Sequence, residues 1–544
     1  MSPEAELRRQ VASLLVVRGS GHAEDRQRRY PRWELPNQEL RRLIGEGIGG
    51  VILLGGSSTE LQQRCQTLQS WAREPLLLCA DVEEGVGQRF EGGTWLVPPM
   101  ALGRLHARDP ERAIALAERY GRCTGRQARR CGLNWVLAPV ADVNNNPGNP
   151  VINVRAWGDS PDCVKALACA FQRGLASTGV LGCAKHFPGH GDTGVDSHLQ
   201  LPVLRHDKAR LERVELPPFA QLIQTGIDSV MTAHLLIPAL DPELPATLSR
   251  AVLTNLLRDD LGFQGLVVTD ALVMEAISKR WGAGEAARLA FAAGADLILM
   301  PADADAAIEA IVAALQSGVI PREHLETALA RRQQALQKVA AAAASGATGE
   351  GFQDEPLELD GERSLALELI QLSLETQGPL PLPPLNAEGI NLLRVDTVLP
   401  SPLLRADAPS LALAEAAGYR SLICHPQGIS PWQPGADENP LALERLGDGN
   451  VLLQLFLRGN PFRGERDRAE PWSAALRQLQ KQQRLAGLVV YGCPYTWANL
   501  RRELEPQIPA VYAPGQMAEA QQAALSLLLG SSEPSAMAVE GFTD

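Results

Sequence analysis

The sequence predicts an α/β protein, a (β/α)8 barrel of the TIM type followed by a smaller αβα sandwich domain. Over the N-terminal part of the chain, short apolar runs alternate with longer amphipathic stretches, the pattern of repeated βα units. The composition changes at residues 340–354, where an alanine run leads into a segment rich in Gly, Ser and Thr. We therefore expect the barrel at residues 1–340, a linker at 341–356 and the sandwich at 357–544.

Individual elements of the barrel follow from the lengths of the apolar and amphipathic stretches. Strands are expected at residues 50–54, 76–80, 135–138, 179–184, 229–232, 265–269 and 297–300. Helices are expected at residues 111–131, 161–178, 211–225 and 283–293. About seven or eight strands in a span of this length fit a closed eight-stranded barrel.

The second segment has the same alternation on a smaller scale. A helix is expected at residues 357–376 and another at 517–529, around apolar runs at 390–395, 421–424, 450–457, 487–491 and 510–512. The segment has no glycine-rich phosphate loop, and its one histidine, His425, lies beside Pro426 in an expected loop. We interpret this domain as structural, or as one wall of a cleft.

Composition excludes some classes of function. The chain has 544 residues with 45% hydrophobic and 21% charged residues, and its net charge of -12 argues against a nucleic-acid or anionic-membrane binder. The apolar run at residues 11–17 is too short to span a bilayer and has no cleavage site, so we expect no signal peptide and a cytoplasmic location. Nine cysteines without metal-like spacing are expected to be reduced core thiols.

One run concentrates ionisable side chains. The run KHFPGHGDTGVDSH at residues 185–198 follows the apolar run 179–184, which we expect to be a buried parallel strand. Pro188 lacks an amide proton and each glycine destabilises a helix interior by roughly 1 kcal/mol, so a loop is expected. Lys185 and His186 should leave the strand at its carboxyl end, where active sites of α/β folds are built.

The end of this run places a carboxylate near an imidazole. Asp196 precedes His198 by two residues, close enough for the carboxylate to accept a proton from Nδ1. Such a contact orients the ring and makes His198 a candidate general acid or base. The competing interpretation is a metal site, because His186, His190 and His198 could all be ligands.

Polar residues also follow several other predicted strands. They are Asp81 with Arg89 eight residues later, Asp142 with Arg155 beyond it, His234, and Asp270. Their recurrence in one register is typical of a site assembled from several βα loops. For Asp270 the alternative is structural, because Asp is a common N-cap and a helix opening at Ala271 is expected.

Taken in order, these motifs resemble glycoside hydrolase family 3, and within it the β-N-acetylglucosaminidase branch. The resemblance covers most of residues 10–340. It is carried by residues 81–89, 138–144, 149–152, 185–198 and 268–272. The run at 185–198 is the most specific of these, while the second segment resembles the family's αβα sandwich without an equally specific motif.

Roles for individual residues follow from the resemblance. It implies a retaining mechanism with Asp270 as the nucleophile and His198, paired with Asp196, as the acid/base. It further implies that the sugar's hydroxyl and N-acetyl groups are bound by Asp81, Arg89, Arg155, Lys185 and His186. A structural ion pair is the alternative role for Arg155 and for Lys185. No metal or other cofactor is expected, and no oligomeric state is predicted.

Two segments depart from the family's usual pattern. Residues 81–88 read DVEEGVGQ where the family usually has DQEGGR, which leaves the geometry of this loop open but keeps Asp81 and Arg89. Residues 155–158 read RAWG in place of RSFG, which keeps Arg155 and changes the expected wall of the sugar pocket.

The expected function is that of an exo-acting hydrolase that releases terminal β-linked N-acetylglucosamine. For a cytoplasmic enzyme, the most natural substrates are small carbohydrates such as imported peptidoglycan fragments (GlcNAc-MurNAc muropeptides). The alternatives are a β-glucosidase or β-xylosidase of the same family, a barrel metallohydrolase using His186, His190, His198 and Asp270, a sugar-binding protein without turnover, and phosphate as the acceptor in place of water. The Asp-Ser-His triplet at 196–198 favours the acetamido sugar, because the branch without it resembles the glucosidases.

Overall fold

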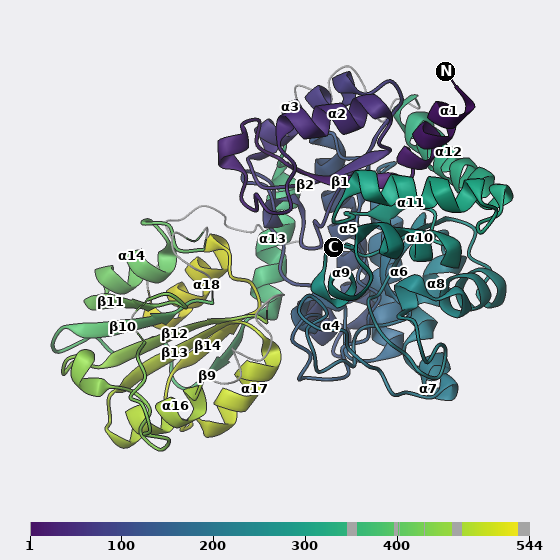
Figure 1. Ribbon diagram of the computed structural model, residues 1–544. Helices are drawn as coiled ribbons and strands as arrows, with labels where there is room; N and C mark the ends of the chain where they lie inside the picture. Colours follow the sequence, from purple (N-terminus) through teal and green to yellow (C-terminus); the bar gives the residue numbers. More distant parts are fainter. Residues whose placement is uncertain are drawn as a thin grey trace. The chain divides into compact units, whose positions relative to one another are not determined.

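The computed structural model describes residues 2–344, 356–396, 401, 403–428, 430–459 and 470–530 of the chain. These residues form two compact units, the first reaching Ala366 and the second starting at Leu367 (Figure 1). The predicted linker at 341–356 lies mostly outside the described residues, so the predicted domain borders stay predictions.

The first unit is the predicted barrel of parallel strands. Strands β4, β3, β2, β1 and β8 form one sheet in that order, and β5, β6 and β7 form a second. Parallel bridges from Trp135 to Leu181 and from Val268 to Leu297 join the two sheets at both edges, which closes the ring. The strands are β1 Leu15–Ser20, β2 Gly50–Leu54, β3 Leu77–Ala80, β4 Trp135–Val136, β5 Cys183–Phe187, β6 Ser229–Thr232, β7 Leu266–Val268 and β8 Ile298–Leu299.

Helices surround this ring (Figure 1). They are α1 Pro3–Ala12, α2 Asn37–Glu46, α3 Ser58–Trp71, α4 Met100–His106, α5 Pro110–Arg130, α6 Pro161–Ala176, α7 Lys208–Arg213, α8 Leu216–Gln224, α9 Glu275–Trp281, α10 Ala283–Ala293, α11 Ala304–Gln316 and α12 Arg322–Ala344, with the π-helical segment η5 Ala251–Asp260. The helix expected at residues 211–225 is two helices, α7 and α8. The break has a direct cause, since α8 carries Pro217 in its first turn, where the missing amide proton cannot continue the preceding helix.

Two strands differ from the prediction, and in both the difference involves a charged residue. Strand β1 was not predicted, because Arg18 ends the apolar run in the sequence but lies inside the strand. Strand β5 begins and ends later than residues 179–184, so Lys185 and His186 belong to the strand instead of leaving it. As predicted, no helix forms between His186 and Gly194. The charges are tolerated in these strands because each side chain has a polar partner at the barrel mouth.

The second unit is an αβα sandwich, as predicted. Its sheet has the order β11, β10, β12, β13, β14 and β9, with every neighbouring pair parallel except β14 and β9. Helices α14 and α18 lie on one face of the sheet, and α16 and α17 lie on the other (Figure 1). Helix α13, Asp360–Ser373, contains the border between the two units. The elements that follow it are β9 Glu375–Gln377, β10 Gly389–Arg394, α14 Pro409–Ala416, β11 Tyr419–Cys424, β12 Val451–Leu457, α16 Trp472–Lys481, β13 Leu485–Gly492, α17 Pro494–Glu503, β14 Ala510–Ala513 and α18 Ala518–Leu529.

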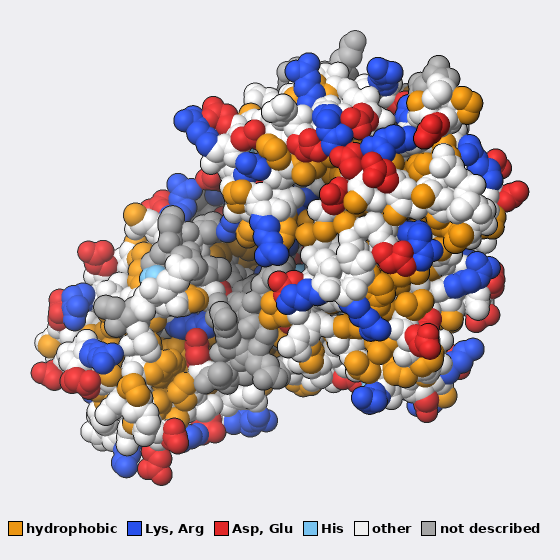
Figure 2. All heavy atoms as spheres, viewed as in Figure 1, with side chains coloured by type: hydrophobic (Ala, Val, Ile, Leu, Met, Phe, Trp, Pro, Cys, Tyr) orange, Lys and Arg blue, Asp and Glu red, His pale blue; other side chains and the backbone are white. Residues whose placement is uncertain are grey.

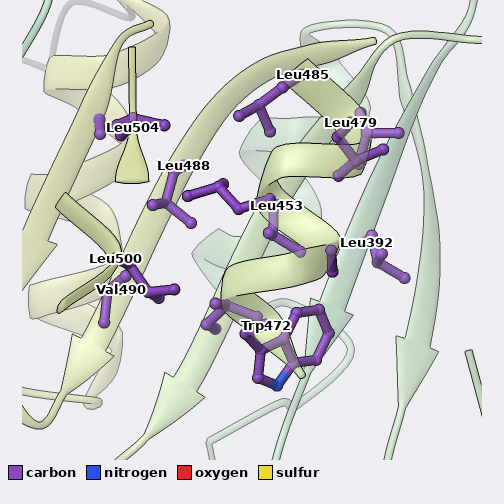
Figure 3. Close-up of a cluster of buried hydrophobic side chains, with 14 of the residues drawn as sticks. Leu392, Leu453, Trp472, Leu479, Leu485, Leu488, Val490, Leu500 and Leu504 are labelled. Carbon is purple, nitrogen blue, oxygen red and sulfur yellow. The ribbon is translucent and has the colours of Figure 1, made fainter. Parts of the chain in front are cut away.

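The core of the second unit explains why its strands read as continuous apolar runs. Leu453 and Leu488 come from neighbouring strands and are fully buried against Trp472 of α16 (Figure 3). A parallel sheet that is covered on both faces needs apolar side chains in both alternating directions. Short β9, which was not predicted, lies at the sheet edge and lacks such a run.

The surface and the cysteines agree with the composition. On the face shown in Figure 2, positive and negative side chains are interspersed over the described residues, without an extended field of one sign. All nine cysteines are buried and none forms a disulfide, so the prediction of core thiols is confirmed. Among the described helices, none has both the length and the apolar character needed to cross a bilayer.

Candidate active site

The first part of the site is an ion-pair cluster centred on Glu83, which lies in the loop after β3. Lys185 of β5 places its Nζ atom 2.6 Å from Glu83 Oε1 and 2.7 Å from Asp81 Oδ1. Arg155 donates from two guanidinium nitrogens to the two oxygens of Glu83, each at 2.8 Å. Only 1% of the Lys185 side chain and 3% of the Glu83 side chain are exposed, so the cluster is shielded from water.

The electrostatics of this cluster hold its members charged. Burial acts to raise the pKa of Glu83, but Arg155 and Lys185 outweigh it and hold that pKa well below its ordinary value. Burial acts to lower the pKa of Lys185, but Asp81 and Glu83 outweigh it and raise the pKa. The structural ion pair that we gave as the alternative role for Lys185 and Arg155 is therefore present, and their contact with sugar stays a prediction.

Asp81 and Arg89 lie toward the outer side of the cluster. Arg89 donates from Nε to the backbone oxygen of Asp81 at 3.0 Å, across a loop that contains the short 3-10 helix Val86–Gln88. The Asp81 side chain is 37% exposed, far more than Glu83, while it also accepts from Lys185. The structure thus brings Asp81, Arg89, Lys185 and Arg155 together, although they come from the loop after β3, the loop after β4 and strand β5.

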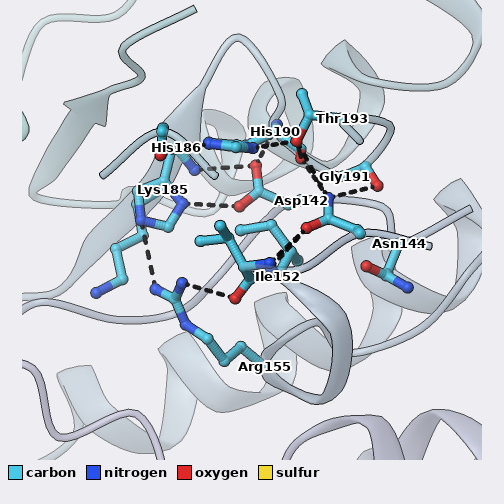
Figure 4. Close-up of polar contacts among 12 residues, drawn as sticks. Asp142, Asn144, Ile152, Arg155, Lys185, His186, His190, Gly191 and Thr193 are labelled. Carbon is cyan, nitrogen blue, oxygen red and sulfur yellow. Dashed lines mark hydrogen bonds and ion pairs between the residues drawn. The ribbon is translucent and has the colours of Figure 1, made fainter. Parts of the chain in front are cut away.

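Asp142 organises the next part of the site, where it follows β4. One carboxylate oxygen, Oδ2, lies 2.8 Å from Nδ1 of His186, and the other, Oδ1, accepts from the backbone amides of His186 and His190 at 3.1 Å and 2.7 Å (Figure 4). Because a carboxylate only accepts, Nδ1 of His186 carries the proton. Nε2 is then the acceptor, and it lies 3.5 Å from Arg155, whose guanidinium only donates.

His190 is hydrogen-bonded to two other residues of the predicted loop. Its Nδ1 lies 2.8 Å from the hydroxyl of Thr193 (Figure 4). Its Nε2 lies 2.9 Å from the hydroxyl of Ser197. Burial lowers the pKa of His190 to about 4, so the ring is neutral at neutral pH and donates from one nitrogen while accepting at the other. These bonds fix the segment that precedes His198.

The contact predicted between Asp196 and His198 is present. Oδ1 of Asp196 lies 2.9 Å from both Nδ1 and the backbone nitrogen of His198. The carboxylate is 1% exposed and the imidazole 19%, so Asp196 is behind the ring and His198 reaches the solvent side. With Nδ1 engaged, Nε2 is the nitrogen that His198 directs to a partner.

Asp270 follows β7, and no helix begins beside it. The nearest helix, α9, begins at Glu275 with Met274 as its N-cap, so the alternative of an N-cap for a helix at Ala271 is wrong. Instead, Oδ1 of Asp270 accepts from the amide of Ala271 at 2.7 Å. The short turn at 271–274 separates the carboxylate from the helix and leaves it at the end of the strand.

Three imidazoles act electrostatically on the Asp270 carboxylate. Burial acts to raise its pKa, but the charges of His234, His186 and His198 outweigh that effect and lower the pKa to about 2. His234 is itself fixed, with Nδ1 2.8 Å from Thr247 Oγ1 and Nε2 3.1 Å from the backbone oxygen of Ala271. His198 is therefore near enough to Asp270 for its charge to act, which brings the predicted nucleophile and acid/base to one site.

Three further residues of this site were given no role from the sequence. Asp142 and His234 were named only among the polar residues that follow predicted strands, and Glu83 lay unremarked within the segment 81–89. Their signal was a position after a strand, in the same register as Asp81 and Asp270. That signal identifies the end of the barrel but not which side chains pair with one another.

The contacts around the histidines also bear on the metal alternative. Within the described part of the chain, no group of three or more His, Cys, Asp or Glu side chains is arranged to hold a metal ion. His190 has hydroxyl groups at both ring nitrogens, and Nε2 of His186 faces the guanidinium of Arg155, which repels a cation. His186, His190, His198 and Asp270 therefore do not form the donor set that a metallohydrolase needs.

Charged side chains gathered at the carboxyl ends of barrel strands define the class of (β/α)8-barrel enzymes. Residues 6–335 match the glycosyl hydrolase family 3 N terminal domain, and residues 384–530 match the bacterial glycosyl hydrolase family 3 C-terminal domain. The chain belongs to glycosyl hydrolase family 3, a family of glycoside hydrolases, and the predicted family is confirmed.

Relatives and solved structures place it more closely within the family. A protein named beta-hexosaminidase A from Pseudoalteromonas piscicida is 34% identical over 390 residues, 66% of this chain and 64% of that relative's own length. A family 3 beta-N-acetylglucosaminidase from Paenibacillus sp. str. FPU-7 is similar over 97% of both chains, with a TM-score of 0.77 and 30% identity. NagZ from Neisseria gonorrhoeae, in complex with N-trifluoroacetyl-D-glucosamine, is similar over 66% of this chain and 98% of that chain, with a TM-score of 0.51 and 30% identity.

Proposed function

We propose that the protein is a retaining exo-β-N-acetylglucosaminidase. The observation that supports this best is the location of Asp270 and His198 at one barrel mouth, where the charge of His198 lowers the pKa of Asp270. A carboxylate that stays ionised suits a nucleophile, and an imidazole oriented by Asp196 suits proton transfer. The names of the relatives support N-acetylglucosamine as the sugar.

The reaction divides into two steps. In the first, a carboxylate oxygen of Asp270 bonds to the anomeric carbon as the glycosidic bond breaks, and the Nε2 proton of His198 goes to the departing oxygen. In the second, Nε2 takes a proton from water, whose oxygen displaces Asp270 from the anomeric carbon. Asp196 keeps Nδ1 protonated and stabilises the imidazolium in both steps, because its carboxylate accepts from Nδ1.

The sugar is held by the ion-pair cluster. Asp81, which is partly exposed, accepts from sugar hydroxyl groups, while Arg89, Arg155 and Lys185 donate to sugar oxygens and to the N-acetyl carbonyl. His186 lies between Asp142 and Arg155, and its Nε2 can accept from a sugar hydroxyl group. Peptidoglycan fragments that carry a terminal GlcNAc are the proposed natural substrates, and a cytoplasmic location stays a prediction.

A panel of chromogenic substrates tests the activity. We expect hydrolysis of the β-N-acetylglucosaminide to exceed that of the β-glucoside and β-xyloside by at least about 100-fold in kcat/KM, a difference of roughly 2.7 kcal/mol. The rate should not change with a chelator, and inorganic phosphate should not replace water in the product. Equal turnover of the glucoside would contradict the choice of sugar, and loss of activity in chelator would favour the metallohydrolase.

Removing the imidazole of His198 tests the proton-transfer step. We expect His198→Ala to reduce kcat/KM, which reports the first step, roughly 10²- to 10⁴-fold for an alkyl glycoside, whose departing oxygen needs a proton. The loss of kcat/KM should be far smaller for a glycosyl fluoride, because fluoride departs without a proton. The kcat/KM of Asp196→Asn should lie between the values for His198→Ala and the wild type. His106→Ala, which removes an imidazole at the end of α4, is the matched control. An equal loss with both substrates would show that His198 does not act as the acid.

A further inference from the structure

Strand β1 directs an arginine into the barrel. A Cβ atom on Gly19 would lie 3.0 Å from Leu40 of α2 and 3.2 Å from Val51 of β2, so position 19 faces the surrounding helices. Successive residues of a strand point to opposite faces, and Arg18 therefore points to the interior of the barrel. The Arg18 side chain is 16% exposed, which places most of it within the mouth.

Arg18 is within electrostatic range of two predicted sugar-binding residues. Burial lowers its pKa, while the negative charges of Glu34 and Asp81 act in the opposite direction and the positive charge of Arg89 acts in the same one. Asp81 and Arg89 are therefore close enough to Arg18 for their charges to act on it. Neither the sequence motifs nor the proposed mechanism uses this arginine.

Two aromatic rings from the loop between β1 and α2 cover the guanidinium. Its central carbon lies 5.3 Å from the centre of the Tyr30 ring and 5.9 Å from that of Trp33. The two rings are stacked, 5.9 Å apart at an interplanar angle of 28°. Beneath them Glu34 is buried, with Oε1 3.8 Å from Arg18 and Oε2 accepting from the amide of Tyr30 at 3.0 Å. Cation–π contact and the buried carboxylate together hold the rings in place.

The loop between β1 and α2 lies at the mouth of the barrel. It begins at the carboxyl end of β1, the end of the barrel at which the loops that carry Asp81, Asp142 and Asp270 also begin. The charge of Arg32 in this loop acts on Glu275, the first residue of α9. Tyr30 is 38% exposed.

We propose that the Tyr30–Trp33 pair, supported by Arg18, is a stacking surface for the sugar ring on the leaving-group side of the scissile bond. The proposal rests on the proposed function. The terminal sugar occupies the buried region around Lys185 and Glu83, so the next sugar lies farther out, at the rim formed by the loop. One face of a pyranose carries C–H groups, which pack on the apolar, electron-rich face of an aromatic ring.

Comparing two substrates distinguishes an effect on binding of the leaving-group sugar from an effect on the chemical step. We will compare a β-1,4-linked N-acetylglucosamine disaccharide, which has a second sugar, with N-acetyl-β-glucosaminyl fluoride, which has none. Tyr30→Ala is expected to lower kcat/KM for the disaccharide roughly 5- to 20-fold, mainly through KM. The kcat/KM for the fluoride should change by less than about twofold. Tyr30→Phe keeps the ring and should restore the disaccharide rate. Trp33→Ala should have the same selective effect.

Trp71→Ala is the matched control. Trp71 is also covered by arginines, with Arg41 and Arg64 at 5.7 Å and 5.6 Å from its ring. It ends α3, and in a (β/α)8 barrel the carboxyl end of a helix lies at the end opposite the active site. Unchanged disaccharide turnover in Tyr30→Ala, or equal loss with both substrates, would overturn the stacking surface. Failure of the wild type to cleave the fluoride would instead refute the proposed function.

Discussion

Replacing Asp270 with Asn should lower kcat for β-N-acetylglucosaminides on the order of 10⁴-fold or more, the largest effect that we expect from one substitution. The amide has no charge to attack the anomeric carbon, whereas its oxygen can still accept from the amide of Ala271, as Oδ1 of Asp270 does. Substrate affinity should therefore change much less than turnover. Steady-state kinetics and binding of the unhydrolysed sugar by calorimetry separate the two quantities.

Because its pKa is low, Asp270 should not titrate in the working pH range. Burial acts to raise the pKa, but His234, His186 and His198 lower it to about 2, so the nucleophile is ionised above that pH. Loss of kcat/KM as the pH falls from 7 toward 4 must then come from another group. The pH profile of kcat/KM checks this. If the midpoint of its acidic fall moved in Asp270→Glu but stayed the same in His198→Ala, the titrating group would be Asp270 after all.

Azide rescue distinguishes a nucleophile from a merely important residue. In Asp270→Ala, azide can enter the space of the lost carboxylate and should form the α-glycosyl azide, the product of a single displacement. Asp260→Asn, an exposed aspartate at the end of η5, is the matched control and should have wild-type kinetics. A reaction that proceeds through the substrate's own acetamido group would leave the protein without covalent label, which mass spectrometry of a trapped reaction would reveal.

Glu83→Gln should have the largest effect on stability. The change leaves Lys185 and Arg155 without the carboxylate that accepts from both of them, inside a region that water does not reach. Breaking a buried ion pair from one side costs about 3–5 kcal/mol, because the remaining charges lose their compensation. The free energy of unfolding of the barrel should fall by that amount, measured as a shift of its urea transition. Displacement of Arg155 and Lys185 should also lower kcat/KM by about 100-fold.

The stabilisation of the folded barrel by Glu83 also depends on pH. Its pKa in the folded protein is held well below the ordinary value, so the folded state binds this proton less readily than the unfolded state. The stabilisation is complete above the unfolded pKa of about 4.3 and is lost as the pH falls toward the folded pKa. Barrel stability should therefore fall less steeply with acid in Glu83→Gln than in the wild type.

The second unit offers a matched control for this substitution. Glu470 also receives two guanidinium bonds, from Arg394 at 2.7 Å and 2.8 Å, but 25% of its side chain is exposed. Glu470→Gln should cost about 1 kcal/mol or less, because water can replace part of the lost interaction, and it should leave turnover unchanged. An equal shift in both variants would show that burial of the Glu83 cluster does not determine its strength.

The sequence by itself determined the two architectures and the main chemical groups. Alternating apolar and amphipathic stretches identified seven of the barrel strands, because a parallel strand covered on both faces must be apolar along its length. The run at 185–198 and the position of Asp270 identified the end of the barrel that carries the site. The spacing of Asp196 and His198 was enough to predict their contact, since two residues on one loop cannot lie far apart.

The tertiary structure alone decided the partners. Glu83 bonds to Arg155 and Lys185, and Asp142 bonds to His186, across gaps of 72, 102 and 44 residues that only the closed ring of strands brings together. It also decided that Arg18 belongs to a strand, because the polar partners that make its charge tolerable come from elsewhere in the chain. A charge in a strand looks unfavourable until its partner is known, and the partner is determined by barrel closure and not by local sequence.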